Sequence, residues 1–365
     1  MAAEVRFKLG EGRISGALSA LLGLSALGGV LCFRHPEWFT SVELREQYDP
    51  AVLREVLFWG LVVGSLSGAI NFVFEKGRVA AILGLAACAF AVALGGAGVD
   101  TSGAPAHRLS LGLDWLILGL LVSALVFIPL EKLFGLRRDQ PILRRQWVTD
   151  LQYFAVNSLF FSYIVLITTN AVPVTMGWAV SDSVQQTVRA WPGWVQFVVA
   201  VFCADFAQYW VHRSYHRWLW PVHAVHHSAP AMDWLAGSRL HVIEVLATRA
   251  LVFGVLFLIG FSEPVVQAYV VLVGAQAVFA HTNVGIEFGW LSYVLVTPRY
   301  HHWHHATDRA AADTNFAVHL PVIDWMFGTL RLPPKGEWPE SYGVMGPPVP
   351  DGLLRQAVYP FRRRD

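Results

Sequence analysis

Long apolar runs constrain the fold of this chain more than any other feature of its sequence. A helix needs about 20 apolar residues to cross roughly 30 Å of hydrocarbon. Eight candidate spans reach or approach that length, several of them short or interrupted: 15–33, 56–74, 79–99, 115–129, 154–170, 195–211, 242–261 and 264–280. Only 15% of the 365 residues are charged, against about a quarter in soluble domains. We therefore predict an all-α, polytopic membrane bundle of about eight membrane helices.

Charge and cysteine content exclude several other classes of protein. The formal net charge is +1, which argues against a nucleic-acid partner. Cys32, Cys88 and Cys203 lie far apart in apolar stretches, so neither a disulfide framework nor a thiolate metal site is expected. The first span exceeds the apolar core of a signal peptide and no small-x-small cleavage site follows, so we expect it to be retained.

The distribution of basic residues predicts the orientation in the membrane. The loop after the fourth span carries five basic residues: Lys132, Arg137, Arg138, Arg144 and Arg145. Its neighbours, 98–113 and 171–190, carry only Arg108 and Arg189. Because short cytoplasmic loops are enriched in Lys and Arg, 132–148 is expected to be cytoplasmic. Counting spans outward then places both termini and the 212–240 segment on the cytoplasmic side.

Two features of this plan leave alternatives open. The loop at 34–55 carries three arginines and fits the orientation less well, although its five acidic residues make it a mixed-charge loop. The last two spans are joined only through Ser262 and Glu263, so a re-entrant hairpin is the alternative to two crossings. Both ends of such a hairpin would still face the cytoplasm.

Histidine is the most unusual residue type in this sequence. There are 14 histidines, and eleven of them lie between His212 and His305. Positions i and i+3 or i+4 share one face of a helix, so each cluster directs its imidazoles to one place. Ten form a pattern of one HxxxH, two HxxHH and two single residues: His212, His216, His223, His226, His227, His241, His281, His301, His304 and His305. By the span count, all ten reach the same membrane face.

Proline and N-cap residues predict the local structure around the HxxHH motifs. Pro221 and Pro298 suit the first turn of short helices, with Thr297 as the N-cap of the second. We therefore expect a cap of short helices at the cytoplasmic face. The remaining histidines, which fall outside the pattern, are expected to be structural: His35, His107, His302 and His319.

Ten clustered imidazoles point to metal. Neutral imidazole binds Zn, Fe, Cu or Ni. Ten ligands are too many for one ion, but two ions with five nitrogens each would keep one octahedral position open for a small ligand. Structural zinc would instead close its shell at four ligands and usually recruit cysteine. A ligating imidazole usually donates its other N–H to an outer partner. Six polar residues near the histidine motifs are candidates for this role: Asp205, Gln208, Glu244, Asn283, Asp308 and Asn315. Helix capping or surface ion pairing is the equally open alternative for each.

At this point the motifs resemble a known family. HRSYH at 212–216, HAVHH at 223–227, HHWHH at 301–305, Thr314-Asn315-Phe316 and the Asp324–Thr329 segment look like the sterol desaturase and fatty acid hydroxylase superfamily of membrane diiron oxygenases. Ser238-Arg239-Leu240-His241 resembles another of its segments, with Val242 where proline is usual, and the likeness covers about 146–332. It implies that the ten histidines ligate two irons. Some hydroxylases of the superfamily have a further histidine where this chain has Ala277.

The predicted function is oxidation of a lipid. Two irons would use O2 to hydroxylate or desaturate a C–H bond, and zinc can occupy the same nitrogens in purified samples. No haem-attachment, dinucleotide-binding or iron–sulfur motif is present, so an external ferredoxin, cytochrome or reductase is expected to supply electrons. The alternatives are a dizinc membrane hydrolase and a non-enzymatic metal transporter or sensor.

The sequence also predicts three regions. These are a four-helix membrane region at 1–133, a catalytic domain at 146–332 and a Pro- and Arg-rich cytoplasmic tail at 333–365. The role of the first is open, and close helix packing there could support a homo-oligomer. The tail, which ends in Arg362-Arg363-Arg364 before Asp365, is expected to lie along anionic headgroups.

Overall fold

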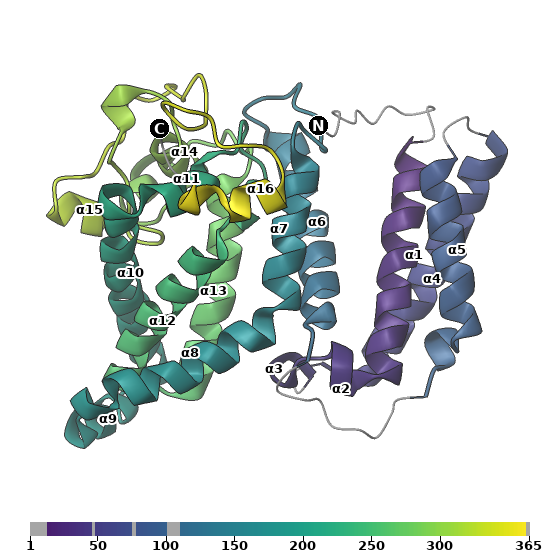
Figure 1. Ribbon diagram of the computed structural model, residues 1–365, viewed down its shortest axis with the longest axis horizontal. Helices are drawn as coiled ribbons and strands as arrows, with labels where there is room; N and C mark the ends of the chain where they lie inside the picture. The colour runs from purple at the N-terminus through teal and green to yellow at the C-terminus, as the bar shows by residue number, and fades with distance from the viewer. Residues whose placement is uncertain (1–12, 46–47, 75–77, 101–109, 363–365) are drawn as a thin grey trace.

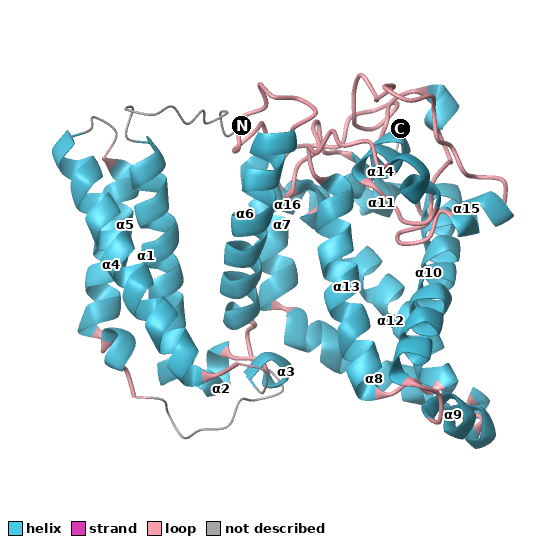
Figure 2. Ribbon diagram, turned by 180° about the vertical axis from the view of Figure 1, so that it is seen from behind, coloured by secondary structure: helices cyan, strands magenta, loops and turns pink. Residues whose placement is uncertain are grey.

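The computed structural model describes residues 13–45, 48–74, 78–100 and 110–362. Within these ranges the chain is helical, with two isolated bridges and no strand (Figures 1 and 2). The predicted all-α class is confirmed.

Seven helices are long and apolar enough to cross a membrane. They are α1 (Arg13–Arg34), α4 (Pro50–Phe74), α5 (Val79–Ala93, continued by the turn Gly96–Gly98), α6 (Leu113–Phe134), α10 (Gly193–Trp218), α12 (Val242–Ile259) and α13 (Glu263–His281). The chain is therefore a multi-pass membrane protein.

The predicted fifth span, 154–170, is not one straight helix. It is divided between α7 (Trp147–Leu159) and α8 (Phe161–Met176), and the two axes bend by 54°. Asn157 at the end of α7 donates to the Ser238 carbonyl (3.0 Å), whereas α8 leaves to follow α12. A Cβ on Gly254 of α12 would lie 2.5 Å from the sulfur of Met176, so the missing side chain permits this contact. Counted as one bent span, the pair brings the total to eight.

The N-terminal helices α1, α4 and α5 pack closely through small residues. A Cβ on Gly84 of α5 would lie 2.3 Å from the Ser19 backbone of α1, so only glycine fits this crossing. The short helices α2 (Pro36–Phe39) and α3 (Val42–Arg45) follow α1. Ser41 between them donates its N–H (2.9 Å) and hydroxyl (3.1 Å) to Asp114, which ties this corner to the start of α6.

Short helices cover one end of the C-terminal bundle. α11 (Trp220–His227), α14 (Pro298–His304), α15 (Val322–Met326) and α16 (Leu353–Ala357) gather at the end where α10 and α13 finish, while α9 (Asp182–Arg189) lies at the opposite end (Figure 1). Thr297 caps α14 by accepting from the Tyr300 N–H, as its sequence predicts. We call this the capped end of the bundle.

The three predicted regions are joined by hydrogen bonds at the capped end. Glu131 of α6 accepts from the backbone N–H groups of Trp234 (2.7 Å) and Asn283 (3.1 Å). Tyr342 of the tail donates to His302 Nδ1 (2.8 Å). The last helix of the 1–133 region and the start of the tail therefore support the central part directly. Arg363, Arg364 and Asp365 lie outside the described residues.

Candidate metal centre

Nine of the ten predicted ligands form two groups at the capped end. The first group is His212, His216, His223, His227 and His304, and the second is His226, His281, His301 and His305. In each group the candidate ligand atoms all lie within 4.8 Å of one another. The groups are adjacent, since the rings of His227 and His305 stack with centroids 4.3 Å apart.

The helices explain this convergence. α10 ends with His212 and His216 one turn apart, and α13 ends with His281. α11 and α14 lie across these ends, and each distributes its HxxHH motif between the two groups. The pattern therefore divides by helix face and not by motif, because His226 and His227 are neighbours in sequence but point to different groups.

The nitrogen spacing fits metal ions. In the first group, Nε2 of His223 lies 3.0 Å from Nε2 of His212 and 3.1 Å from Nε2 of His227. In the second group, Nε2 of His301 lies 3.0 Å from Nε2 of both His281 and His305. Two imidazoles at right angles on one ion, with bonds of about 2.1 Å, place their nitrogens roughly 3.0 Å apart.

The protonation of these rings also calls for a cation. His212 Nδ1 donates to the Phe316 carbonyl (2.8 Å) and His223 Nδ1 donates to Glu244 (2.7 Å). The carbonyl can only accept, and so can an ionised carboxylate, so Nδ1 carries the proton and each Nε2 presents a lone pair. His226 and His281 repeat the arrangement in the second group, with their Nδ1 atoms on the carbonyls of Arg239 (3.1 Å) and Ala277 (2.6 Å). Lone pairs that face one another at 3.0 to 3.3 Å repel unless a positive ion lies between them.

Burial keeps the imidazoles neutral. The pKa values of His226, His227 and His304 lie well below the ordinary value. Burial is the main cause, and the neighbouring imidazoles are the second. The ligand lone pairs are therefore available at neutral pH. Trp220 covers the first group from outside, with its ring 5.2 Å from the rings of both His216 and His227.

His241 belongs to neither group. Its Nδ1 accepts from the Ile243 N–H (3.2 Å) and its Nε2 donates to the Ala357 carbonyl (3.0 Å). It is therefore the N-cap of α12, and the five-plus-five division expected from the sequence is five plus four among the described residues.

The histidines expected to be structural have varied surroundings. His302 donates to the Thr282 carbonyl (3.0 Å) and accepts from Tyr342, so it holds the tail. His35 lies beside Glu37 on the surface. His319 is buried with neither ring nitrogen hydrogen-bonded in the described structure, and burial lowers its pKa to about 4. His107 lies outside the described residues.

Of the six predicted outer partners, Glu244 contacts a clustered histidine, His223. Asp205 accepts from the backbone N–H groups of Val318, His319 and Leu320, and so holds the segment that carries the Phe316 carbonyl. The other four have no hydrogen bond to a clustered histidine within the described chain. Asn283 binds the Arg137 backbone, and Asp308 caps a turn. Asn315 binds the backbone of Tyr300 and Arg331, and Gln208 is half-buried.

Sequence reasoning named Asn315 but missed the outer partners in the segment 313–320, which we call the strap. Asp313 accepts from His216 (3.2 Å), and this hydrogen bond lowers the pKa of Asp313. The carbonyls of Thr314 and Phe316 accept from His304 (2.8 Å) and His212. Backbone carbonyls carry no sequence signal, so only the fold reveals these partners.

A buried ion-pair network beneath the second group was also missed. Arg144 binds Asp150 (2.7 Å) and Asp233 (2.9 Å), and Arg239 binds Asp150 (2.6 Å). All four side chains are almost fully buried. The carbonyl of Arg239 accepts from His226, so the network fixes the orientation of a second-group imidazole. Unpaired charges in an apolar sequence were the available signal, but their pairing depends on the fold.

Comparison with known proteins agrees with this geometry. Residues 197–329, which hold all nine clustered histidines, match the fatty acid hydroxylase family model. This match supports the resemblance to the sterol desaturase and fatty acid hydroxylase superfamily that the histidine motifs indicate. The chain is also similar to ornithine lipid hydroxylase OlsE of Rhizobium tropici, 34% identical over 48% of this chain and 53% of that protein. Human alkylglycerol monooxygenase is 33% identical over 35% of this chain and 28% of that protein.

The similarity covers only part of this chain and of its relatives. The matched segment covers about half the length of the Rhizobium protein and less of the human one. A rice very-long-chain aldehyde decarbonylase, GL1-6, is 28% identical over 34% of this chain and 21% of that protein. No solved structure matches the chain significantly.

Proposed function

We propose that this chain is a membrane diiron oxygenase that hydroxylates or desaturates a C–H bond of a lipid. The observation that carries the proposal is the pair of adjacent all-histidine groups, whose Nε2 lone pairs converge at ligand spacing. Iron ions bound there would supply O2 activation and C–H oxidation, with electrons from an external ferredoxin, cytochrome or reductase.

The chain's own residues would hold and orient these ions. Five nitrogens in the first group and four in the second leave coordination positions open for exogenous ligands on octahedral ions. Outer acceptors fix the ring orientation of His212, His223, His226, His281 and His304. Trp220 and the strap cover the first group and exclude bulk water from it.

A lipid substrate follows from the relatives and from the position of the site. The two most similar relatives named above are hydroxylases or monooxygenases of lipids. The histidine groups lie where spans α10 and α13 end, so an apolar chain could approach from the bilayer while a polar head stays near water. The cytoplasmic orientation of this end and homo-oligomerisation through the N-terminal helices remain predictions.

The two other predicted functions are not favoured. Metallohydrolases generally use bridging carboxylates, whereas both groups in the described chain contain imidazoles alone. A metal transporter needs ligands along a membrane path, whereas these ligands gather at one end of the bundle.

Metal content and O2 use test the proposal. Anaerobically purified protein would be reconstituted with iron, reduced with dithionite, freed of excess reductant and then exposed to O2. We expect about two irons per chain and O2 uptake, both lost when His226→Ala is combined with His304→Ala. His302→Gln is the matched control, since His302 lies on the same helix outside both groups. Two zinc ions that iron cannot replace, with no O2 uptake even with lipid extract, would contradict the proposal.

A further inference from the structure

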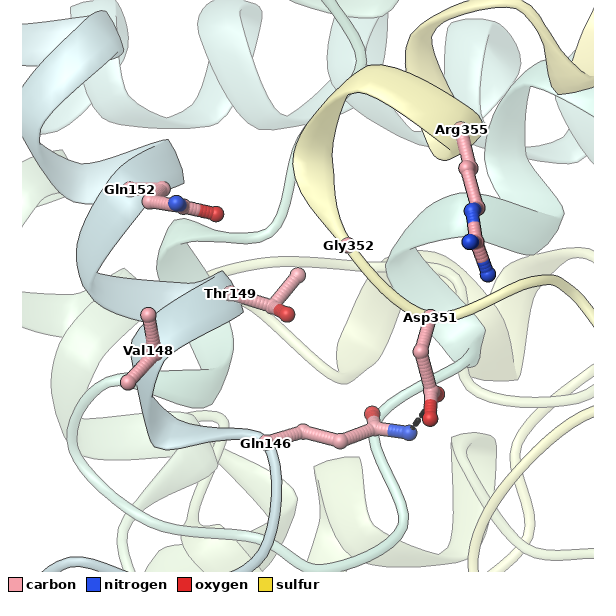
Figure 3. A pocket seen from close by; sticks show the side chains of 7 residues that line it. All are labelled: Gln146, Val148, Thr149, Gln152, Asp351, Gly352 and Arg355. Atoms are coloured by element: carbon pink, nitrogen blue, oxygen red, sulfur yellow. Dashed lines mark hydrogen bonds between the residues drawn. The ribbon is translucent and has the colours of Figure 1, made fainter. Parts of the chain in front are cut away.

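A cavity lies between the start of α7 and the tail, with polar and charged residues in its lining. Its volume is about 480 Å³, within the range of small-molecule sites. Its walls are Gln146, Val148, Thr149 and Gln152 on one side and Asp351 and Arg355 on the other (Figure 3). We call it the tail pocket.

The tail pocket presents both signs of charge. Arg355 has no hydrogen bond or ion pair with the described part of the chain. Asp351 accepts from Gln146 through one oxygen, and its second oxygen is left to bind a donor. Thr149 and Gln152 add a hydroxyl and an amide across the opening (Figure 3). A ligand with an ammonium and an oxyanion would complement this pair of charges.

The surroundings of the tail pocket place it at the level of lipid headgroups. α16 lies across the upper part of α7, near the level of α11 (Figure 1). Leu354 and Phe361 are 82% and 69% exposed, and Val358 lies exposed between them at helical spacing. An exposed apolar stripe beside Arg355 and Arg362 is typical of a segment in the membrane interface.

A short relay of hydrogen bonds connects the tail pocket to the second histidine group. Gln146 accepts from the Arg239 guanidinium (2.9 Å), and the Arg239 carbonyl accepts from His226 Nδ1 (3.1 Å). On the tail side, the Ala357 carbonyl accepts from His241, and Gln356 donates to Ser228 (3.4 Å). Two residues, Gln146 and Arg239, thus separate a ligand in the pocket from a clustered imidazole.

We propose that the tail pocket binds the zwitterionic headgroup of a lipid, with the ammonium at Asp351 and the oxyanion at Arg355. This inference rests on the proposed function, because it makes the bound lipid the substrate of the adjacent centre. The oxyanion can be a carboxylate, as in an amino-acid lipid, or a phosphodiester, as in phosphatidylethanolamine. In either case the headgroup would be anchored beside the second group while the acyl chains stay in the bilayer.

Lipid binding by the intact purified chain tests the inference. Native mass spectrometry would count bound lipid for three probes with identical acyl chains: an N-acyl ornithine lipid, phosphatidylethanolamine and phosphatidylglycerol, which lacks the ammonium. We expect one or both zwitterions to bind better than phosphatidylglycerol, and the better of the two identifies the oxyanion. Asp351→Asn should remove this preference, and Arg355→Gln should weaken zwitterion binding about tenfold, as expected for a lost charge-assisted hydrogen bond.

Arg362→Gln is the matched control, because Arg362 lies on the same segment outside the pocket. Equal binding of phosphatidylglycerol, or unchanged binding in both pocket variants, would overturn the inference. Asp351→Asn keeps an acceptor for Gln146, and an unchanged thermal midpoint would exclude misfolding. The binding readout needs no turnover, so preserved lipid selectivity without O2 uptake would reject the proposed function alone. O2 uptake without lipid selectivity would reject the tail pocket alone.

Discussion

At the scale of single residues, the carboxylate of Glu244 has the most specific contact with the candidate centre. The carboxylate accepts from His223 Nδ1 at 2.7 Å. The backbone carbonyl of Glu244 accepts from the Tyr215 hydroxyl (3.3 Å). The contact fixes the tautomer of His223, because the carboxylate requires a proton on Nδ1. His223 Nε2, which lies within about 3 Å of two other ligand nitrogens, is therefore held as a lone-pair donor.

Removing this carboxylate should weaken metal binding in the first group. We expect Glu244→Leu to lower metal affinity about 10- to 100-fold, the usual effect of losing an outer partner. Glu244→Gln should lose less, since its amide oxygen can still accept from His223. Metal retained per chain after graded chelator treatment is the measurement. Equal retention in wild type and Glu244→Leu would show that the contact does not support the site.

At the scale of elements, the strap is held between two buried carboxylates. Asp205 of α10 accepts three backbone N–H groups, from Val318 (2.8 Å), His319 (3.1 Å) and Leu320 (2.6 Å). Asp324 of α15 accepts from the backbone of Phe316 (2.8 Å) and Ala317 (2.7 Å). These bonds aim the carbonyls of the strap at the ligand imidazoles. The position of the carbonyls that accept from the first-group imidazoles therefore depends on how the whole strap is held.

The Asp205→Asn variant should loosen the strap. An amide has one acceptor oxygen and brings an NH2 toward backbone donors, so we expect a loss of about 2 to 4 kcal/mol in unfolding free energy. The thermal midpoint should fall, and chelators should remove metal from the first group sooner. Asp308→Asn is the control, since Asp308 caps an exposed turn and Asn is an equally good cap. If both variants melt alike, the strap is not anchored by Asp205.

At the scale of the whole molecule, the candidate chemistry of the described residues gathers at one end of the bundle. The two histidine groups, the buried ion pairs and the tail pocket lie at the capped end. α9 lies at the opposite end (Figure 1). The basic linker between α6 and α7 is also at the capped end. By the positive-inside rule, this end should face the cytoplasm.

Cysteine labelling in intact cells measures that orientation. In a background with Cys32, Cys88 and Cys203 replaced by alanine, single cysteines would replace Ser183 of α9 or Arg217 at the end of α10, both exposed positions. We expect a membrane-impermeant maleimide to label the Ser183→Cys variant in intact cells, and the Arg217→Cys variant only after permeabilisation. The reverse pattern would invert the predicted orientation and place the site outside the cytoplasm.

The sequence by itself determined the membrane class, the helical architecture and the histidine motifs, because apolar length and local spacing are written in the chain. Thr297 as an N-cap and His302 as a structural residue also follow from local register. Only the tertiary structure decided how ligands are shared, since His226 and His227 separate by helix face and His241 caps α12. It also decided the outer partners and the tail pocket, because carbonyls and paired charges acquire their roles only when distant segments meet.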